Sequence, residues 1–225
     1  MRNGAQILVV SGLFAATVIA ALVLFVSNAP KAPVVQPVTP QPVTQPQPAP
    51  STSHKIYTNT LSGFSVQYPD TILHTEDTQD MQLSGYIPVC DPDYAVVCFP
   101  IPKDAYAGTN FGSAAFAVHL RDDLKTSSAC ETWQGGELVD GDATINGTSY
   151  KKFSYSEGAM SHRLDGENYR TFRDGTCFEL STRVATTVFE VYEPGTVKLF
   201  SDANRSALQA ALDAMLTSFR FASGS

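Results

Sequence analysis

Residues 143–187 read ATINGTSYKKFSYSEGAMSHRLDGENYRTFRDGTCFELSTRVATT, and this stretch decides the fold. It contains two turn dipeptides, Asn146-Gly147 and Asp174-Gly175, and both tolerate the positive φ that a two-residue hairpin turn requires. The segments between them are rich in β-branched and aromatic residues, which favour strands. The stretch therefore predicts an antiparallel meander with strands at residues 143–145, 148–157, 161–173 and 176–186.

The last of these strands is predicted to have two different faces, because side chains alternate along a strand. The residues expected to face the core are Phe178, Leu180, Thr182 and Val184. Those expected on the opposite face are Cys177, Glu179, Ser181 and Arg183. Residues 126–133 carry Cys130 and begin with Thr-Ser-Ser, which suits a helix N-cap. We therefore expect a short helix bearing Cys130 to cover the face on which Cys177 lies.

The sequence on either side of the meander predicts more strands and a C-terminal helix. Strands are expected at residues 55–58, 64–69, 95–101 and 113–121, with long surface loops over the rest of residues 70–112. Residues 202–218 place apolar side chains at helical spacing, with Ser201 or Asp202 as the N-cap, and residues 219–221 end the helix or form a short strand. These elements give an α+β fold class, an antiparallel β-sheet covered by helices.

Residues 7–26 form an uncharged and mostly apolar run near the N-terminus. About 20 residues at roughly 1.5 Å rise each match the roughly 30 Å hydrocarbon core of a bilayer, so we expect a single transmembrane helix. A cleaved signal peptide is the alternative, since small residues follow at Ser27-Asn28-Ala29, although Pro30 would then come directly after the cut. Both interpretations export the rest of the chain.

Residues 29–53 are rich in Pro, Val, Gln and Thr. Proline favours an extended and semi-rigid chain, so we expect a spacer here, with a ligand for a proline-recognition domain as the alternative. The expected organisation is a short cytoplasmic N-terminus, a transmembrane anchor, a Pro-rich linker, one extracytoplasmic domain and a tail, at residues 1–6, 7–26, 29–53, 54–222 and 223–225. The expected location is the cell membrane, with the C-terminal domain outside the cytoplasm.

The charge of the chain excludes one class of partner. The net charge of the 225 residues is −7, and residues 1–53 hold two cations and no acid, so the rest carries −9. A protein that binds phosphate backbones needs a basic patch. We therefore expect no nucleic-acid partner.

The four cysteines, Cys90, Cys98, Cys130 and Cys177, all fall in the expected exported domain. No C-x-x-C motif occurs, which excludes a thioredoxin-type motif and a zinc ribbon. Thiols are oxidised outside the cytoplasm, so we expect two disulfides, with free buried thiols as the alternative. Of the three pairings, we favour Cys90 with Cys98 and Cys130 with Cys177.

The sequence contains no motif for catalysis or for a cofactor. It lacks the G-x-S-x-G elbow, the P-loop and paired histidines at metal-binding spacing, and we expect His119 to be an ordinary strand residue. Asp140 and Asp142 are the candidate calcium ligands, but acidic pairs of this kind are also explained by turn chemistry. One group of aromatic residues predicts core packing or, alternatively, a recognition face: Trp133, Tyr150, Phe153, Tyr155, Tyr169 and Phe172.

Two short motifs resemble a known family. Residues 63–69, GFSVQYP, lie near the start of the domain, and residues 216–219, LTSF, close the C-terminal helix. Together they are similar to PsbP-like domains. The resemblance implies an antiparallel sheet between helices, an α/β/α sandwich, and for bacterial envelope members a binding or assembly role. It implies no catalytic residue.

Three functions are compatible with these features. The first is a membrane-anchored extracytoplasmic binding or assembly module without catalytic activity, whose partner is another envelope component. The second is an envelope enzyme, a hydrolase, with its site in the loops at residues 70–110. The third is a structural surface protein held away from the membrane on its linker.

Overall fold

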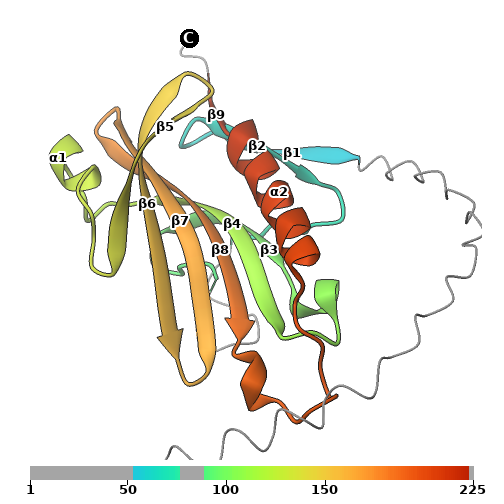
Figure 1. Ribbon diagram of the computed structural model, residues 1–225. Coiled ribbons are helices and arrows are strands. Elements are labelled where there is room, and N and C mark those ends of the chain that lie inside the picture. The colour runs from blue at the N-terminus through green and yellow to red at the C-terminus, as the bar shows by residue number, and fades with distance from the viewer. Residues whose placement is uncertain (1–52, 77–88, 223–225) are drawn as a thin grey trace, which may run out of the picture. The chain divides into compact units, whose positions relative to one another are not determined.

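Two antiparallel sheets and one long helix organise the part of the chain that the structure describes (Figure 1). This computed structural model describes residues 53–76 and 89–222. The predicted anchor at residues 7–26, nearly all of the predicted linker and the tail at residues 223–225 lie outside the described residues. Among the described helices, none is long and apolar enough to cross a membrane.

The larger sheet has six strands, in the order β3-β4-β8-β7-β6-β5, and all neighbours are antiparallel. Its strands are β3 (Ala95–Ile101), β4 (Phe111–Leu120), β5 (Glu137–Ile145), β6 (Thr148–Ala159), β7 (His162–Arg173) and β8 (Thr176–Thr187). The predicted meander is therefore confirmed. Both turn dipeptides adopt positive φ, with values of 47° and 80° at Asn146 and Gly147 and of 51° and 80° at Asp174 and Gly175.

Strand β5 is longer than predicted, because it begins at Glu137 rather than at residue 143. Its pairing with β6 shifts register between Val139 and Gly141, and Gly141 has a φ of 108°. A bulge of this kind interrupts the two-residue alternation by which a strand is recognised in a sequence. The bulge therefore explains why the first half of this strand was missed.

The smaller sheet joins the two ends of the domain. It has the order β1-β2-β9, with β1 (His54–Asn59), β2 (Phe64–Pro69) and β9 (Arg220–Phe221), which confirms the predicted hairpin and the short terminal strand. Helix α2 (Asp202–Ser218) precedes β9, and its N-cap Ser201 accepts a hydrogen bond from Asn204 N at 3.2 Å. Two short 3-10 helices complete the described elements, η1 (Lys103–Tyr106) and η2 (Phe189–Val191).

Helix α2 covers one face of the six-stranded sheet, which we call the apolar face (Figure 1). Its buried side chains are Leu208, Leu212, Met215 and Leu216, as the sequence pattern predicted. They join the core residues Phe116 and Leu180 of the sheet. This cluster is the main hydrophobic core, since burial of apolar surface is the dominant stabilising contribution to folding.

The two motifs that resemble the PsbP-like family meet in this core. Strand β2 comes from the first motif, and the end of α2 comes from the second. The rings of Phe64 and Phe219 stack with their centroids 5.4 Å apart, and Ser218 Oγ accepts from Gln67 N at 2.9 Å. Residues about 150 positions apart in the sequence are thus fixed against one another.

The opposite face, which we call the polar face, carries only one short helix among the described residues, α1 (Ser127–Cys130). Thr126 caps it by accepting from Ala129 N at 3.1 Å, as predicted, and a disulfide joins Cys130 to Cys177. Within the described ranges the fold is therefore mostly sheet, with the long helix α2 on one face and only the four-residue α1 on the other, so the helical covering of both faces that a sandwich implies is found only in part. Loop residues cover part of the second face: Val89 and Cys90 are buried, which corrects the expectation of surface loops there.

Candidate functional site

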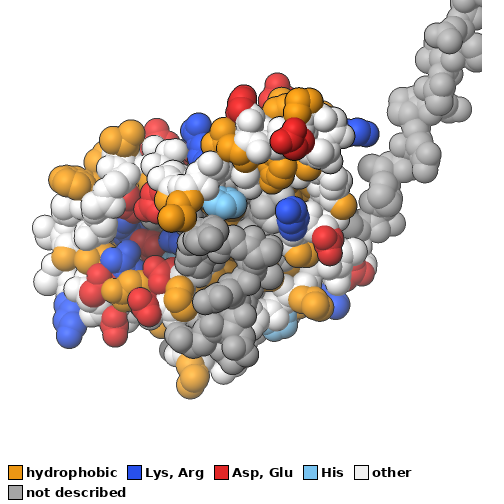
Figure 2. Space-filling view, turned by 90° about the horizontal axis from the view of Figure 1, so that it is seen from below, with side chains coloured by type: hydrophobic (Ala, Val, Ile, Leu, Met, Phe, Trp, Pro, Cys, Tyr) orange, Lys and Arg blue, Asp and Glu red, His pale blue; other side chains and the backbone are white. Residues whose placement is uncertain are grey.

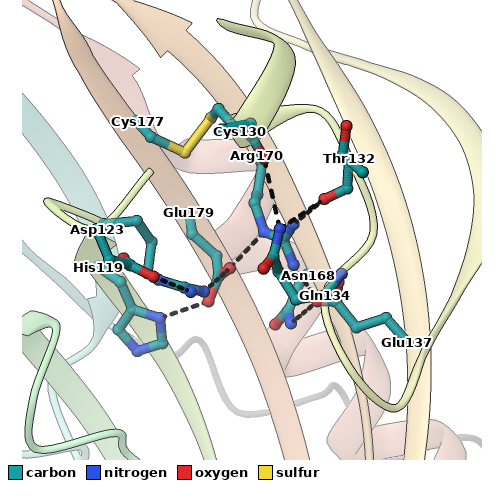
Figure 3. Close-up of polar contacts among 12 residues, drawn as sticks. His119, Asp123, Cys130, Thr132, Gln134, Glu137, Asn168, Arg170, Cys177 and Glu179 are labelled. Atoms are coloured by element: carbon teal, nitrogen blue, oxygen red, sulfur yellow. Dashed lines mark hydrogen bonds and ion pairs between the residues drawn. A yellow bond between two sulfur atoms is a disulfide. The ribbon is translucent and has the colours of Figure 1, made fainter. Parts of the chain in front are cut away.

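The polar face holds a group of charged side chains, shown in Figure 3, which we call the ionic cluster. It consists of His119, Arg121, Asp123, Glu137, Arg170 and Glu179. Strands β4, β7 and β8 place three of them in one row, because His119 pairs with Glu179 and Arg170 also pairs with Glu179 across the sheet. Their side chains therefore point to the same face and meet.

Glu179 is the centre of the ionic cluster, and its side chain is 3% exposed. One carboxylate oxygen accepts from His119 Nδ1 at 3.0 Å, and the other accepts from Arg170 Nε at 2.6 Å and from Arg121 Nη1 at 3.1 Å. Burial alone would raise the pKa of this carboxyl. The hydrogen bond from His119 and the positive charges of Arg170 and Arg121 outweigh burial and hold the pKa of Glu179 well below its usual value.

Arg170 is fully buried and uses its whole guanidinium group. Besides Glu179, it donates to the Thr132 carbonyl at 2.9 Å and to the Glu137 carboxylate, and it lies over the Phe153 ring at 4.4 Å. These contacts tie β7 to β8, to β5 and to the loop after α1. A buried guanidinium is tolerated only when it is paired in this way.

The arrangement of the ionic cluster favours support of the fold rather than catalysis. An ionised Glu179 can only accept, so His119 donates from Nδ1, which leaves Nε2 as the free ring nitrogen. His119 is fully buried, and Nε2 has no hydrogen-bond partner among the described residues. Ser181 lies on the same face, but its hydroxyl also has no partner within the described ranges. A nucleophile and base pair requires a hydrogen bond between the two groups, and this pair does not make one.

His74 and His119 do not share a site. The ring of His74 contacts Tyr57, Tyr68 and Phe99 on the apolar side of the sheet, and its Nδ1 lies 3.1 Å from the Tyr68 hydroxyl. His119 lies on the polar face. In the described part of residues 70–110, His74 therefore takes part in aromatic packing, and residues 77–88 of the same segment lie outside the described residues.

The candidate calcium ligands Asp140 and Asp142 lie on strand β5, not in a turn, so the turn interpretation is wrong for both. Each pairs with a lysine of the neighbouring strand: Asp140 with Lys152 at 2.9 Å and Asp142 with Lys151 at 2.5 Å. Cross-strand pairs of opposite charge explain these carboxylates without a metal. Among the residues that the structure describes, no group of three His, Cys, Asp or Glu side chains could hold a metal ion.

The predicted aromatic group is divided between the two faces of the sheet. Tyr150 and Tyr169 belong to the main core, whereas Tyr155 packs with the residues around Cys90 on the polar face. Trp133 is exposed. These aromatic residues therefore form no single recognition face, and core packing describes most of them.

Two of the cavities in the described part of the chain lie elsewhere, where the β5–β6 and β7–β8 turns meet β9. A cavity of about 470 Å³ is lined by the β5–β6 turn, Tyr150 and β9. An adjoining cavity of about 590 Å³ is lined by the β1–β2 turn and the β7–β8 turn. Both are lined by Arg173, Phe221 and Ala222, so we call the two together the Arg173 cleft.

The opposite end of the molecule, shown in Figure 2, has a mixed surface. Hydrophobic side chains lie there in separate groups, with acidic and basic side chains between them. Such scattered apolar side chains are normal on a monomeric protein. The cleft is therefore the better candidate for a functional site.

No motif in the sequence points to Arg173. Its only distinction in the sequence is that it precedes the Asp174-Gly175 turn, which places it at the end of a strand. The partner surface, β9, comes from the other end of the domain and reaches the cleft by pairing with β2. No local pattern could have joined these two segments.

Comparison with known proteins gives similarity only at the level of solved structures. No protein-family model matches the chain, and no curated protein matches it. Thirteen chains of solved structures do match. One, a protein from Bacteroides thetaiotaomicron, has a TM-score of 0.40 and 10% sequence identity over 75% of this chain and 48% of its own, so this chain spans about half the length of that protein.

Two further structures are similar over nearly their whole length. The yeast (Saccharomyces cerevisiae) Ran-binding protein Mog1p has a TM-score of 0.37 and 13% identity over 76% of this chain and 96% of its own. Cyanobacterial PsbP (CyanoP) from Synechocystis sp. PCC 6803 has a TM-score of 0.36 and 12% identity over 80% of this chain and 99% of its own. At these TM-scores the similarities give no information on ligand or partner. The solved structures nevertheless include a PsbP protein, the family that the two sequence motifs resemble.

Proposed function

We propose that the protein is a membrane-anchored, extracytoplasmic binding module without chemistry of its own, and that it binds an envelope component at the Arg173 cleft. The observation that supports the proposal is the contrast between two sites. The buried side chains of the ionic cluster bind mainly one another, whereas the cleft presents a partly exposed guanidinium beside aromatic rings. The first arrangement serves the fold, and the second is open to a ligand.

The anchoring part of the proposal rests on the sequence. Residues 7–26 are long and apolar enough to span a bilayer, and the Pro-rich linker separates them from the domain. The two disulfides, Cys90–Cys98 and Cys130–Cys177, support a domain outside the cytoplasm, because thiols of cytoplasmic proteins are kept reduced.

Site-specific photo-crosslinking in native membranes tests the binding surface. A photoreactive amino acid at Leu61, which is 98% exposed and lines the cleft, should give a covalent adduct of defined mass. The matched control is Leu199, which is 60% exposed and precedes α2 at the other end of the domain. Adducts of equal yield at both positions, or none at Leu61, would contradict the binding of an envelope component at the cleft.

Alkylation of native membranes followed by mass spectrometry tests the location. All four cysteines should resist alkylation until a reductant is added, because each is in a disulfide. Carbonate washing should leave the full-length chain in the membrane pellet. Four alkylated cysteines without reduction would contradict export, and release of the chain by carbonate would contradict the anchor.

A further inference from the structure

Arg173 is an unusual cation in this protein because of its position. The chain is acidic overall, with a net charge of −7, yet Arg173 lies where the two cavities of the cleft meet, and Arg220 lines the same first cavity. The Arg173 side chain is 41% exposed. Two guanidinium groups beside one concave surface favour an anion, since guanidinium matches carboxylate and phosphate oxygens with paired donors.

The neighbouring acid does not neutralise this position. Arg173 donates through Nε to Asp174 at 3.2 Å, but the Asp174 side chain is 87% exposed. An ion pair so open to water is weak, because solvent and salt screen it. Nε is the only donor of Arg173 that takes part in this bond, so the two terminal nitrogens are the ones to which an anion could bind.

Tyr150 supplies a second and independent observation. It lines the first cavity, is 2% exposed, and its hydroxyl has no hydrogen-bond partner among the described residues. Burial raises the pKa of Tyr150 and the positive charge of Arg173 lowers it, so the guanidinium acts electrostatically on this hydroxyl. A buried hydroxyl without a partner costs free energy, and a ligand oxygen in the cavity would remove that cost.

Aromatic rings form one part of the cleft wall, beside polar residues such as Asn146, Thr148 and Thr176. The Arg173 guanidinium lies 4.4 Å from the centroid of the Phe221 ring. Phe178 and Phe219 contact the same ring edge-on, at 4.9 and 5.0 Å between centroids. A ligand that reaches both Arg173 and these rings must combine a charged group with an apolar group.

We propose that the Arg173 cleft binds a small organic anion, in which a carboxylate or phosphate group is attached to an apolar or aromatic body. The anionic group pairs with Arg173 and accepts a hydrogen bond from the Tyr150 hydroxyl, and the apolar body packs beside Phe221. This inference rests on the proposed function, since it takes the same cleft as the binding surface and specifies its ligand.

Four probes test the chemistry on the purified full-length chain in mild detergent: phenyl phosphate, benzoate, inorganic phosphate and benzyl alcohol. Binding is measured by isothermal titration and by shifts of the backbone amide resonances of residues 146–150 and 219–222. Phenyl phosphate or benzoate should bind and shift these resonances, and the stronger of the two identifies the preferred anionic group. Inorganic phosphate and benzyl alcohol each lack one half of the ligand and should bind at least about tenfold more weakly.

Three variants assign the binding to named groups. Arg173→Met should weaken binding of the better probe by about tenfold or more, because a hydrogen-bonded ion pair is lost. Tyr150→Phe should weaken this binding by about threefold to tenfold without lowering the unfolding temperature, because the hydroxyl has no hydrogen-bond partner among the described residues. The control is Arg163→Met on the same strand, whose guanidinium binds Asp165 instead and should leave binding unchanged.

The outcomes separate this inference from the proposed function. The anion site is overturned if neither aromatic anion binds, or if benzyl alcohol binds as tightly as the better of them. It is also overturned if Arg163→Met weakens binding of the better anion as much as Arg173→Met does. If a Leu61 adduct is still found in membranes, the cleft binds a ligand of a different chemistry and the proposed function stands. If the anions bind but Leu61 gives no adduct, the anion site stands and the proposed binding of an envelope component at the cleft is overturned.

Discussion

The two faces of the six-stranded sheet are built by the same strands but are stabilised by different interactions. On the apolar face, α2 packs Leu208, Leu212 and Met215 against aromatic and aliphatic side chains. On the polar face, the ionic cluster and the Cys130–Cys177 disulfide fix α1 and the loop after it to the sheet. Apolar packing tolerates changes of shape, whereas a buried ion pair depends on each partner. The polar face should therefore be the more sensitive to single substitutions.

The largest effect is expected from Glu179→Gln, which keeps the size of the side chain but removes its charge. Arg170 and Arg121 would then lose the shared carboxylate, and breaking a buried pair costs about 3–5 kcal/mol of the free energy of unfolding. Denaturant titration measures this. The control, Glu157→Gln on exposed β6 surface, should change stability by less than about 0.5 kcal/mol. If Glu179→Gln lowered the free energy of unfolding as little as the control does, the ionic cluster would contribute little to stability.

Leu212→Ala provides the corresponding test of the apolar face. Leu212 is fully buried between α2 and the sheet, and its truncation leaves a cavity, so the expected cost is about 3 kcal/mol. The same denaturant titration applies. The exposed helix residue Asp213, changed to Ala, is the control and should have little effect. If Leu212→Ala cost more than Glu179→Gln, the ranking of the two faces would be reversed.

The two disulfides should differ in how much they stabilise the fold, and the one that closes the longer loop should contribute more. The Cys130–Cys177 bridge spans 47 residues and the Cys90–Cys98 bridge spans 8, and a longer loop restricts the unfolded chain more. Replacing both cysteines of the long bridge with serine should cost about 2–3 kcal/mol, and replacing those of the short bridge about 1 kcal/mol less. Thermal unfolding of both double variants checks the order. An equal loss of stability in the two double variants would mean that loop length does not decide how much each disulfide contributes.

Acid should weaken the polar face before the apolar face. The folded-state pKa of Glu179 lies below its ordinary value of 4.5, so the unfolded chain binds a proton first as the pH falls. The contribution of this carboxylate is therefore complete above about pH 4.5 and is lost progressively below it. The pKa of Asp123 is lowered in the same direction, chiefly by its hydrogen bond with Arg121. The stability of Glu179→Gln, measured from pH 6 to pH 2.5, should fall less steeply than that of the wild type.

The smallest effect on stability is expected from Tyr150→Phe. The tyrosine ring belongs to the main core, but its hydroxyl has no partner among the described residues, so its removal should not lower the free energy of unfolding. Thermal unfolding without ligand measures this. A large loss would mean that the hydroxyl stabilises the fold, and it would weaken the assignment of Tyr150 to a ligand.

Much of the fold followed from local patterns. The two turn dipeptides predicted the meander, and the helical spacing of Leu208, Leu212 and Met215 predicted α2 with its buried face. The first half of β5 was missed because a bulge at Gly141 breaks the alternation. The second face of β8 was predicted to carry Cys177 and Glu179 and to be covered by a helix bearing Cys130, and it is, but the ion pairs of Glu179 were not predicted.

The sequence by itself determined the strands, the turns, the long helix and the residues on each face of β8, because these depend on spacings of a few residues along the chain. The cysteine pairing also followed the favoured prediction, since α1 was expected over the face of Cys177. Only the tertiary structure decided which charges meet and where the cleft lies. Arg173 and Phe221 are distant in the sequence, and they become neighbours only because β9, which follows α2 in the chain, pairs with β2.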